Sequence, residues 1–319
     1  METPKTLLQA ARYFADLNIC EKFMRDIKWH GDEPACPRCG SKRIGEIKSR
    51  RILQCRDCRK QFSSKVGTIF EDSPLGLDRW FVAVWAIANC KNGISSHELS
   101  RSIGVRQSTA WFMLHRIRIA MECGTPDKFD GTSEMDTTYI GGKIDNMHSN
   151  RRDKFLGSRG SIGKTPVHGI LKRKTENTPS QINAAVIGDN GISDTISHVK
   201  QIVKRGSQVC TDEARAYDKL SPDYVHEAVD HSIAYVNGNV HCNGVENFWT
   251  LLKRSIKGTY VAVAPFHLCR YVAEQVFRFN SRELTDAMRF WLLLNHVFNK
   301  RLTYRVLAGV DNSGFMGKV

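Results

Sequence analysis

Apolar residues recur at helical spacing near both ends of the chain, whereas the middle carries short strand-like runs. In residues 1–28 they stand three and four positions apart, which predicts a helix, and residues 68–122 are predicted to be helical throughout. Gly141 and Gly142 indicate a tight hairpin or a bulge, and helices dominate again from about Asn243. Four runs rich in Val, Ile and Thr predict strands over Thr132–Ile140, Pro166–Arg173, Ile182–Ile187 and Gln208–Thr211. The pattern predicts an α/β protein.

The net charge of +14 indicates a polyanionic partner, with nucleic acid ahead of a membrane surface. The longest apolar run, Trp80–Ala88, falls far short of the roughly 20 residues that cross a bilayer, so no membrane-spanning segment is expected. The N-terminal residues lack the basic head, apolar core and cleavage site of a signal peptide. Gly124-Thr125-Pro126 breaks the helical pattern and predicts a linker.

Four of the ten cysteines form two close pairs, and the other six are scattered singly, which is typical of a reducing cytosol. The pairs are Cys36 with Cys39 and Cys55 with Cys58, separated by fifteen residues. Two such pairs supply four thiolates in a tetrahedron, which predicts a structural zinc site without an open position for substrate. A dithiol redox motif would need only one pair and a βαβ setting, so zinc is favoured. The surrounding residues 29–66 hold ten Lys and Arg against four acidic residues, which favours contact with a nucleic-acid backbone over a solvated loop.

Residues 93–111 follow the pattern of a helix-turn-helix. Ser95 or Ser96 caps a short helix, Gly104 begins the turn, and a second helix starts at Gln107. The first turn of that helix would present two hydroxyl side chains to base edges, Ser108 and Thr109. A plain helical hairpin is the alternative, since the local net charge is only +1.

Three carboxylates stand in positions that predict a shared site. Asp136 lies within the first strand, where an acid is disfavoured unless something binds it. Asp212 follows the last strand, either as a metal ligand or as the cap of a helix that starts at Glu213. Glu246 lies on a helix whose apolar stripe leaves Asn243, Glu246 and Lys253 on a common polar face.

A purely structural interpretation of Glu246 is that it forms a capping box with Asn243 at the start of the helix. Considered together, however, Asp136, Asp212 and Glu246 favour paired Mg²⁺ ions, because hard divalent cations prefer oxygen ligands and two of them assist phosphodiester cleavage. Lys253, two turns beyond Glu246, would then hold a DNA phosphate.

At these motifs the chain closely resembles insertion-sequence transposases of the IS1595 type, the ISXO2-like group. The resemblance covers residues 14–283 or so. Thr137 stands where an acid often follows the aspartate, and Val261 stands where a His often follows the tyrosine. Neither departure removes a metal ligand. The matching segments are the two cysteine pairs, Met135–Lys143, Thr211-Asp212, His241–Arg254, Gly258–Tyr260 and His267–Asn280.

The resemblance implies an RNase H-like catalytic domain preceded by a zinc ribbon and a helix-turn-helix-like segment. It implies that Asp136 and Asp212 take the first two metal-ligand positions. We expect Glu246 to be the third ligand, and Asn243 is the alternative. The expected parts are an N-terminal helical segment (1–28), the zinc ribbon (29–66), the DNA-binding segment (67–124), the catalytic domain (125–283) and a C-terminal helical tail (284–319).

The function implied is that of a DDE-type transposase, in which Mg²⁺, or Mn²⁺, assists cleavage of the element ends and the freed 3′-hydroxyl attacks target DNA. The partners would be double-stranded DNA and further copies of the chain, with no membrane and no small-molecule substrate, in the cytoplasm at the nucleoid. Two alternatives stay open: a zinc-ribbon DNA-binding regulator derived from an inactive transposase, and an RNase H-like nuclease that cuts without joining.

The distribution of charge favours DNA over a membrane surface. Residues 151–174 hold eight Lys and Arg against one acid, and the tail from Val261 holds eight against four. Residues 201–260, by contrast, balance at seven against seven and contain two of the three expected ligands. Basic patches therefore surround an acidic site.

Overall fold

The computed structural model describes residues 4–122, 127–142, 163–188, 191–212, 223–229 and 241–310. They fold into two compact units. The first comprises Met1–Met121 together with Leu284–Val319, and the second comprises Glu122–Glu283. The expected linker at 124–126 and the first half of the basic run over 151–174 lie outside the described residues.

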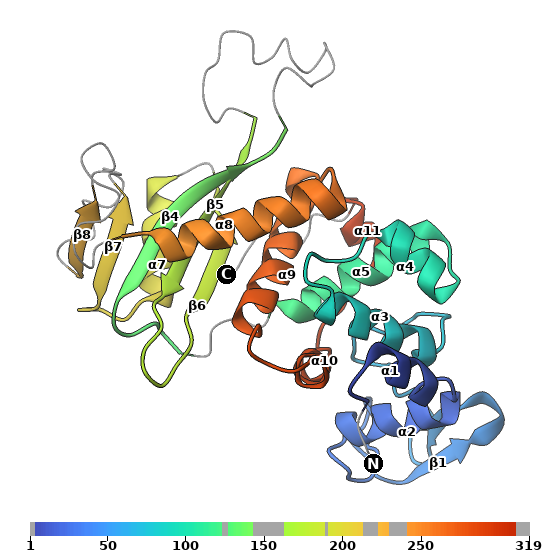
Figure 1. The fold of residues 1–319 in the computed structure, drawn as a ribbon. Coiled ribbons are helices and arrows are strands. Elements are labelled where there is room, and N and C mark those ends of the chain that lie inside the picture. The colour runs from blue at the N-terminus through green and yellow to red at the C-terminus, as the bar shows by residue number, and fades with distance from the viewer. Residues whose placement is uncertain are drawn as a thin grey trace. The chain divides into compact units, whose positions relative to one another are not determined.

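The first unit is mainly helical, and its core is aromatic. Phe81 of α3 contacts Phe14, with ring centroids 4.7 Å apart, and Phe290 of α10 contacts Trp85, with centroids 5.0 Å apart. The segment after residue 284 therefore joins the core of the N-terminal region. The helices of this unit are α1 (Leu7–Tyr13), α2 (Leu17–Lys28), α3 (Leu77–Asn89), α4 (Ser96–Ile103), α5 (Gln107–Met121), α10 (Asp286–Asn295) and α11 (Tyr304–Leu307), with the short turn η1 at Lys48–Arg50 (Figure 1).

Two of the expected helical stretches are interrupted. Residues 1–28 form α1 and α2 rather than one helix, because Asp16 accepts a hydrogen bond from the Asn18 amide at 2.7 Å and starts a new helix. The prediction that residues 68–122 are helical throughout is also wrong. Helices occupy three stretches of that range, and the turn residues 90–95 separate α3 from α4.

A small antiparallel sheet carries the cysteine-rich region. Its order is β1-β2-β3, and Ile44 pairs with Cys55 across the first two strands. The strands are β1 (Ile44–Ile47), β2 (Ile52–Cys55) and β3 (Gln61–Phe62).

The second unit is built on a five-stranded sheet of order β6-β5-β4-β7-β8. The three strands β6, β5 and β4 are antiparallel neighbours, whereas β7 runs parallel to β4 and β8 runs parallel to β7. This mixed order fits the RNase H-like fold. The strands are β4 (Ser133–Ile140), β5 (Thr165–Lys172), β6 (Gln181–Val186), β7 (Gln208–Asp212) and β8 (Val225–Val229).

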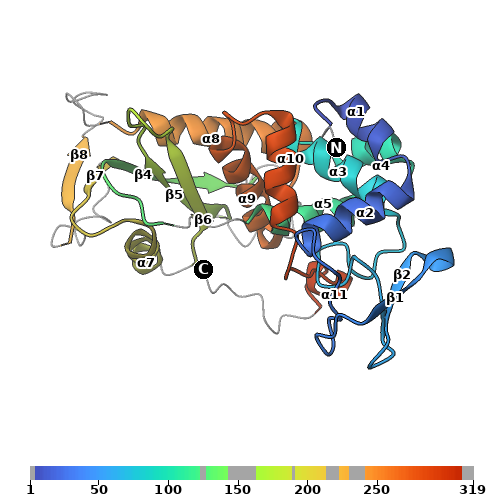
Figure 2. The same ribbon diagram turned by 90° about the horizontal axis from the view of Figure 1, so that it is seen from below.

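Helices cover both faces of this sheet (Figure 2). On one face α8 (Asn243–Ser255) and α9 (Leu268–Asn280) enclose an apolar core with β5 and β6, while α7 (Ile192–Ile202) lies on the opposite face. The π-helical turn η5 (Ile256–Tyr260) follows α8, and the short turn η6 (Pro265–His267) precedes α9. The α8 face and the α7 face therefore have separate cores.

The four predicted strands are confirmed to within a residue or two, but β8 was not predicted. The hairpin expected at Gly141 and Gly142 is not tight. Ile140 pairs with Thr165, so residues 141–164 form the connection. Among the helices in the described part of the chain, none is long and apolar enough to cross a membrane.

Candidate functional site

The four predicted zinc ligands converge. The ligand atoms of Cys36, Cys39, Cys55 and Cys58 all lie within 4.8 Å of one another, and the Cys36–Cys58 and Cys39–Cys55 sulfur pairs are 3.6 Å apart. A tetrahedral ion with Zn–S bonds of about 2.3 Å places its sulfur ligands roughly 3.8 Å apart. The arrangement fits structural zinc. Among the described residues, these four cysteines are the one group of His, Cys, Asp or Glu side chains close enough to share a metal ion.

The ribbon has only a small core of its own. Cys36, Cys55, Leu53 and Phe62 are buried together, and Trp29 packs against them. Gly40 adopts φ +73°, as a turn around the metal requires. Because so few apolar side chains are buried, zinc binding should supply much of the folding free energy of this region.

The structure confirms the two helices and the turn expected over residues 93–111, which a helix-turn-helix and a plain helical hairpin share. Ser95 accepts a hydrogen bond from the Glu98 amide at 3.1 Å and caps α4. Gly104 ends α4 in the left-handed conformation, at φ +66°, and α5 starts at Gln107. Of the two hydroxyl side chains expected to face base edges, Ser108 is exposed and Thr109 is half-buried, and Arg106 just before α5 is exposed.

The two aspartates stand at corresponding positions on neighbouring parallel strands. The register pairs Met135 of β4 with Thr211 of β7, and the next residue on each strand is Asp136 and Asp212 respectively. Adjacent parallel strands lie about 4.8 Å apart, so the backbones of the two residues are close. The helix expected from Glu213 and the Asp212 side chain lie outside what the structure describes.

Asp136 is held by a side chain from α8. Its Oδ1 atom accepts a hydrogen bond from the Thr137 amide at 2.6 Å, and its Oδ2 atom accepts one from the Trp249 indole nitrogen at 2.8 Å. The Trp249 ring packs over Gly169, which pairs with Asp136 across β4 and β5. A Cβ atom at position 169 would lie 2.7 Å from two atoms of the ring. The glycine thus makes room for the indole that orients the aspartate.

The remaining expected residues lie along α8. Asn243 and Glu246 are exposed and Lys253 is half-buried. With 3.6 residues per turn, Glu246 and Lys253 lie about 60° and 40° around the helix axis from Trp249, on the same side. Both side chains therefore leave α8 on the side that carries the Trp249 indole, which contacts Asp136.

The capping box is not formed. Asn243 is the first residue of α8, and the capping position belongs to Cys242, whose side chain makes no capping hydrogen bond. Asn243 and Glu246 therefore do not form the helix cap, which favours the interpretation of one of them as a metal ligand.

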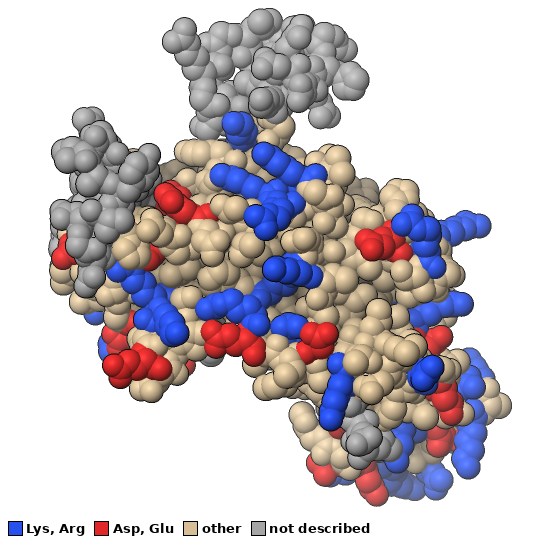
Figure 3. All heavy atoms as spheres, viewed as in Figure 1, with Lys and Arg blue, Asp and Glu red and all other residues tan. Residues whose placement is uncertain are grey.

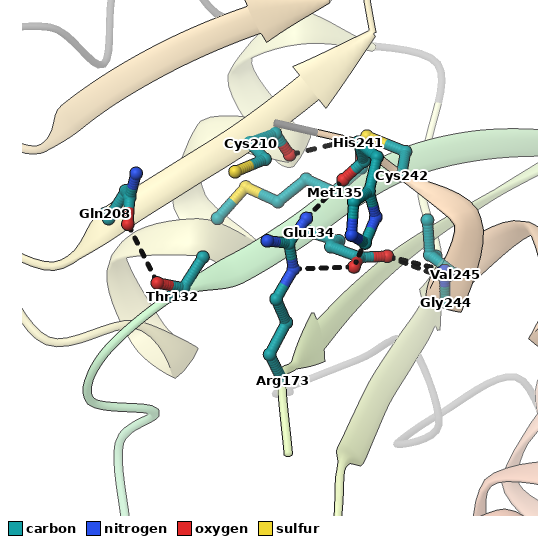
Figure 4. Close-up of polar contacts among 10 residues, drawn as sticks. All are labelled: Thr132, Glu134, Met135, Arg173, Gln208, Cys210, His241, Cys242, Gly244 and Val245. Atoms are coloured by element: carbon teal, nitrogen blue, oxygen red, sulfur yellow. Dashed lines mark hydrogen bonds and ion pairs between the residues drawn. The ribbon is translucent and has the colours of Figure 1, made fainter. Parts of the chain in front are cut away.

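The capping acceptor comes instead from Glu134, a residue that sequence reasoning missed (Figure 4). Its Oε2 atom accepts hydrogen bonds from the amides of Gly244 and Val245 at 2.7 and 3.1 Å. Its Oε1 atom accepts one from Arg173 Nε at 2.7 Å and lies 3.3 Å from His241 Nδ1. The only local signal was a charged residue inside a strand.

A second buried polar group lies on the α7 face. His168 Nδ1 and His198 Nδ1 are 2.8 Å apart, and His198 Nε2 is 2.8 Å from Asn183 Oδ1. Because the Asn183 oxygen only accepts, Nε2 of His198 carries the proton and its Nδ1 accepts from His168. Burial lowers the pKa of His198 to about 4 and that of His168 well below its usual value, so both rings are neutral.

The donor set fits a hard divalent cation. Asp136, Asp212 and Glu246 would supply carboxylate oxygens, and Asn243 an amide oxygen, all of which Mg²⁺ accepts. Lys and Arg side chains lie over the region of α8 (Figure 3), and Arg254 and Lys257 are exposed beside Lys253. Carboxylates next to a basic surface suit a metal-dependent reaction on a phosphodiester.

Comparison with known sequences identifies two domains. Residues 128–280 match the family profile of the ISXO2-like transposase domain, and residues 18–61 match that of the transposase zinc-ribbon domain. A Halobacterium salinarum protein described as "Uncharacterized protein in transposable element ISH50" is 29% identical over 248 residues, which cover 72% of this chain and 80% of the relative. The first match spans the sheet with α8 and α9, and the second contains the four cysteines.

Proposed function

Since the chain belongs to the ISXO2-like transposase family, we propose that it cleaves the ends of an insertion sequence by metal-assisted hydrolysis and joins the freed 3′-hydroxyl to target DNA. The observation that supports the proposal is the register of β4 and β7, in which Asp136 and Asp212 follow paired residues of neighbouring strands, together with the packing of α8 on β4. Glu246 stands on that helix one turn before the tryptophan that binds Asp136.

Asp136, Asp212 and Glu246 would hold one or two Mg²⁺ or Mn²⁺ ions. When bound, such ions make water a stronger nucleophile and stabilise the leaving oxygen. Trp249 keeps the Asp136 carboxylate in one orientation through its indole N–H. Lys253, on the same side of α8 as Glu246, would bind a phosphate of the DNA and bring the backbone to the carboxylates.

The first unit would recognise DNA. The exposed start of α5 would read base edges in the terminal repeats, and the basic ribbon around the zinc site would contact the phosphate backbone. Since an element has two ends, at least two copies of the chain would act together on one element.

The test is a cleavage assay with zinc-loaded full-length protein, Mg²⁺ and a supercoiled plasmid that carries the gene with its flanking DNA. We expect Asp136→Ala and Asp212→Ala to abolish strand cleavage. The matched control is Glu227→Gln, which removes the charge of a strand carboxylate that binds Gln208 at 2.8 Å and should cleave normally. Cleavage that survives Asp136→Ala would refute the proposal.

Two further comparisons in the same assay refine the proposal. Comparing the cleavage by Glu246→Ala with that by Asn243→Ala identifies the third ligand, which we expect to be Glu246. Wild-type cleavage without strand joining would indicate a nuclease, and DNA binding without cleavage would indicate a regulator.

A further inference from the structure

Glu134 is a buried carboxylate without a direct part in the chemistry proposed above. It is 1% exposed, and it stands two residues before Asp136 on β4. We propose that Glu134 is a positioning residue that locks the start of α8 to the strand bearing Asp136 and so sets the position of Glu246. This inference rests on the proposed metal site.

Both oxygens of Glu134 are occupied by protein donors. Oε2 accepts hydrogen bonds from the amides of Gly244 and Val245, and Oε1 accepts one from the Arg173 side chain. Arg173 also donates to the His241 carbonyl at 2.7 Å. The negative charge is therefore balanced by a guanidinium and by the positive end of the helix dipole. Because Glu134 is also buried and its charge is already paired with a guanidinium, we assign it as an anchor rather than a metal ligand.

The anchor replaces a local cap. A helix leaves its first amides without partners inside the helix, and the preceding residue usually supplies an acceptor. Cys242, at that position here, provides none, so the first turn of α8 depends on a residue 110 positions earlier in the chain. The start of the helix is thereby tied to β4 rather than to its own flanking segment.

A second contact joins the same two elements further along, where Trp249 donates to Asp136. The two acids are two residues apart, about 7 Å along a strand. Their partners on α8 are four to five residues apart, about 6–7.5 Å along a helix. The spacings match, so strand and helix are fixed at two points, and Glu246 lies between them.

Gly244 is required by this close approach. A Cβ atom at position 244 would lie 2.8 Å from Glu134 Oε2 and 3.0 Å from Leu171 Cδ2. Replacing this glycine would therefore push the helix start away from the carboxylate while leaving the Glu134 charge in place.

The principal test compares Glu134→Gln with wild type and with the control Glu227→Gln in zinc-loaded full-length protein. Mn²⁺ binding is measured by electron paramagnetic resonance without DNA. Loss of a residue that positions a metal ligand typically weakens metal affinity by about 10–100-fold, and we expect a decrease of that size. Amide hydrogen exchange at Gly244 and Val245 should become faster, whereas exchange in α4 and α5 should not change.

A positioning role also shifts the metal dependence of cleavage. The Mn²⁺ concentration at half-maximal cleavage should rise by about the same factor, and saturating Mn²⁺ should restore most of the rate. A merely structural role would lower the amount of active protein at every Mn²⁺ concentration. A metal-ligand role would abolish cleavage even at saturation, as in Asp136→Ala. Either result, or unchanged Mn²⁺ affinity, would overturn the proposal.

Gly244→Ala provides an independent variant if Glu134→Gln fails to fold, and it should weaken Mn²⁺ binding in the same direction. Failure of the proposed function is distinguishable. If the wild type binds Mn²⁺ but cleaves no DNA, the transposase chemistry fails, while the comparison of Mn²⁺ affinities still decides the role of Glu134.

Discussion

Gly169→Ala should destabilise the second unit, chiefly through a clash with the Trp249 ring. The added methyl group would meet Cζ2 and Cη2 of Trp249 at 2.7 Å and Val245 Cγ2 at 3.3 Å. Carbon atoms in contact prefer separations of about 3.5–4.0 Å, so the indole must retreat by about 1 Å. Trp249 is 4% exposed and lies in a packed core, which leaves little room for the movement.

The magnitude follows from three contributions. Overpacking of a core costs about 1–3 kcal/mol. A retreat of 1 Å would stretch the 2.8 Å bond to Asp136 beyond hydrogen-bonding distance, and loss of a bond to a charged group costs about 1.5–3 kcal/mol. Alanine also restricts the unfolded chain more than glycine does, which raises the free energy of unfolding by about 0.5–1 kcal/mol. The free energy of unfolding should fall by about 3 kcal/mol.

Thiol labelling of the full-length protein measures this change. Cys210 and Cys242 are buried in the second unit, and Cys20 is buried in the first. A loss of about 3 kcal/mol should raise the labelling of Cys210 and Cys242 by about 100-fold, while labelling of Cys20 stays unchanged. Gly142→Ala is the matched control, because its methyl group would meet nothing within 4 Å.

A double-mutant cycle tests the mechanism. Trp249→Phe removes the two ring atoms that would clash, so in that background Gly169→Ala should cost less than about 1 kcal/mol. An equal cost of Gly169→Ala in both backgrounds would show that the contact with the indole is not the cause.

Three further outcomes are expected. Cys39→Ser should abolish binding of one zinc ion, measured by elemental analysis, and make residues 29–66 sensitive to proteases. The pKa of His198 is about 4 in the fold and about 6.5 when unfolded, so the unfolded chain binds more protons between these values. This histidine alone should lower the free energy of unfolding by about 3 kcal/mol as pH drops from about 6.5 to 4, and urea melts of His198→Gln should show a smaller fall. Arg106→Gln should weaken DNA binding and lower the slope of log affinity against log salt by about one, measured by fluorescence anisotropy, whereas an unchanged slope would place Arg106 away from the phosphates.

Local signals explain the parts of the fold that the sequence predicts. Ser95 and Gly104 act within their own helix ends, so the turn between α4 and α5 is predictable from neighbouring residues. The cysteine spacing likewise determines the zinc cluster. Runs of Val, Ile and Thr locate four strands, because alternation and composition are also local properties.

Long-range contacts explain what was missed. The segment after residue 284 was expected to be a tail, but Arg289 donates to Asn89 at 2.9 Å, two hundred positions away. The capping box of Asn243 and Glu246 was plausible locally, yet the helix amides bind Glu134 on a distant strand. A short-range pattern does not reveal which distant acceptor competes with the local one.

Two glycines, Gly244 on α8 and Gly169 on β5, define how the helix meets the sheet. At Gly244 the helix backbone approaches the Glu134 carboxylate, and at Gly169 the strand backbone admits the Trp249 ring. Each leaves no room for a methyl group, and Glu246 lies between the two contacts along the helix. If Glu246 completes the metal site with Asp136, the distance between helix and sheet determines metal affinity as directly as the ligands do. Gly169→Ala and Gly244→Ala, which remove no ligand, should therefore both weaken Mn²⁺ binding, and Gly142→Ala should not.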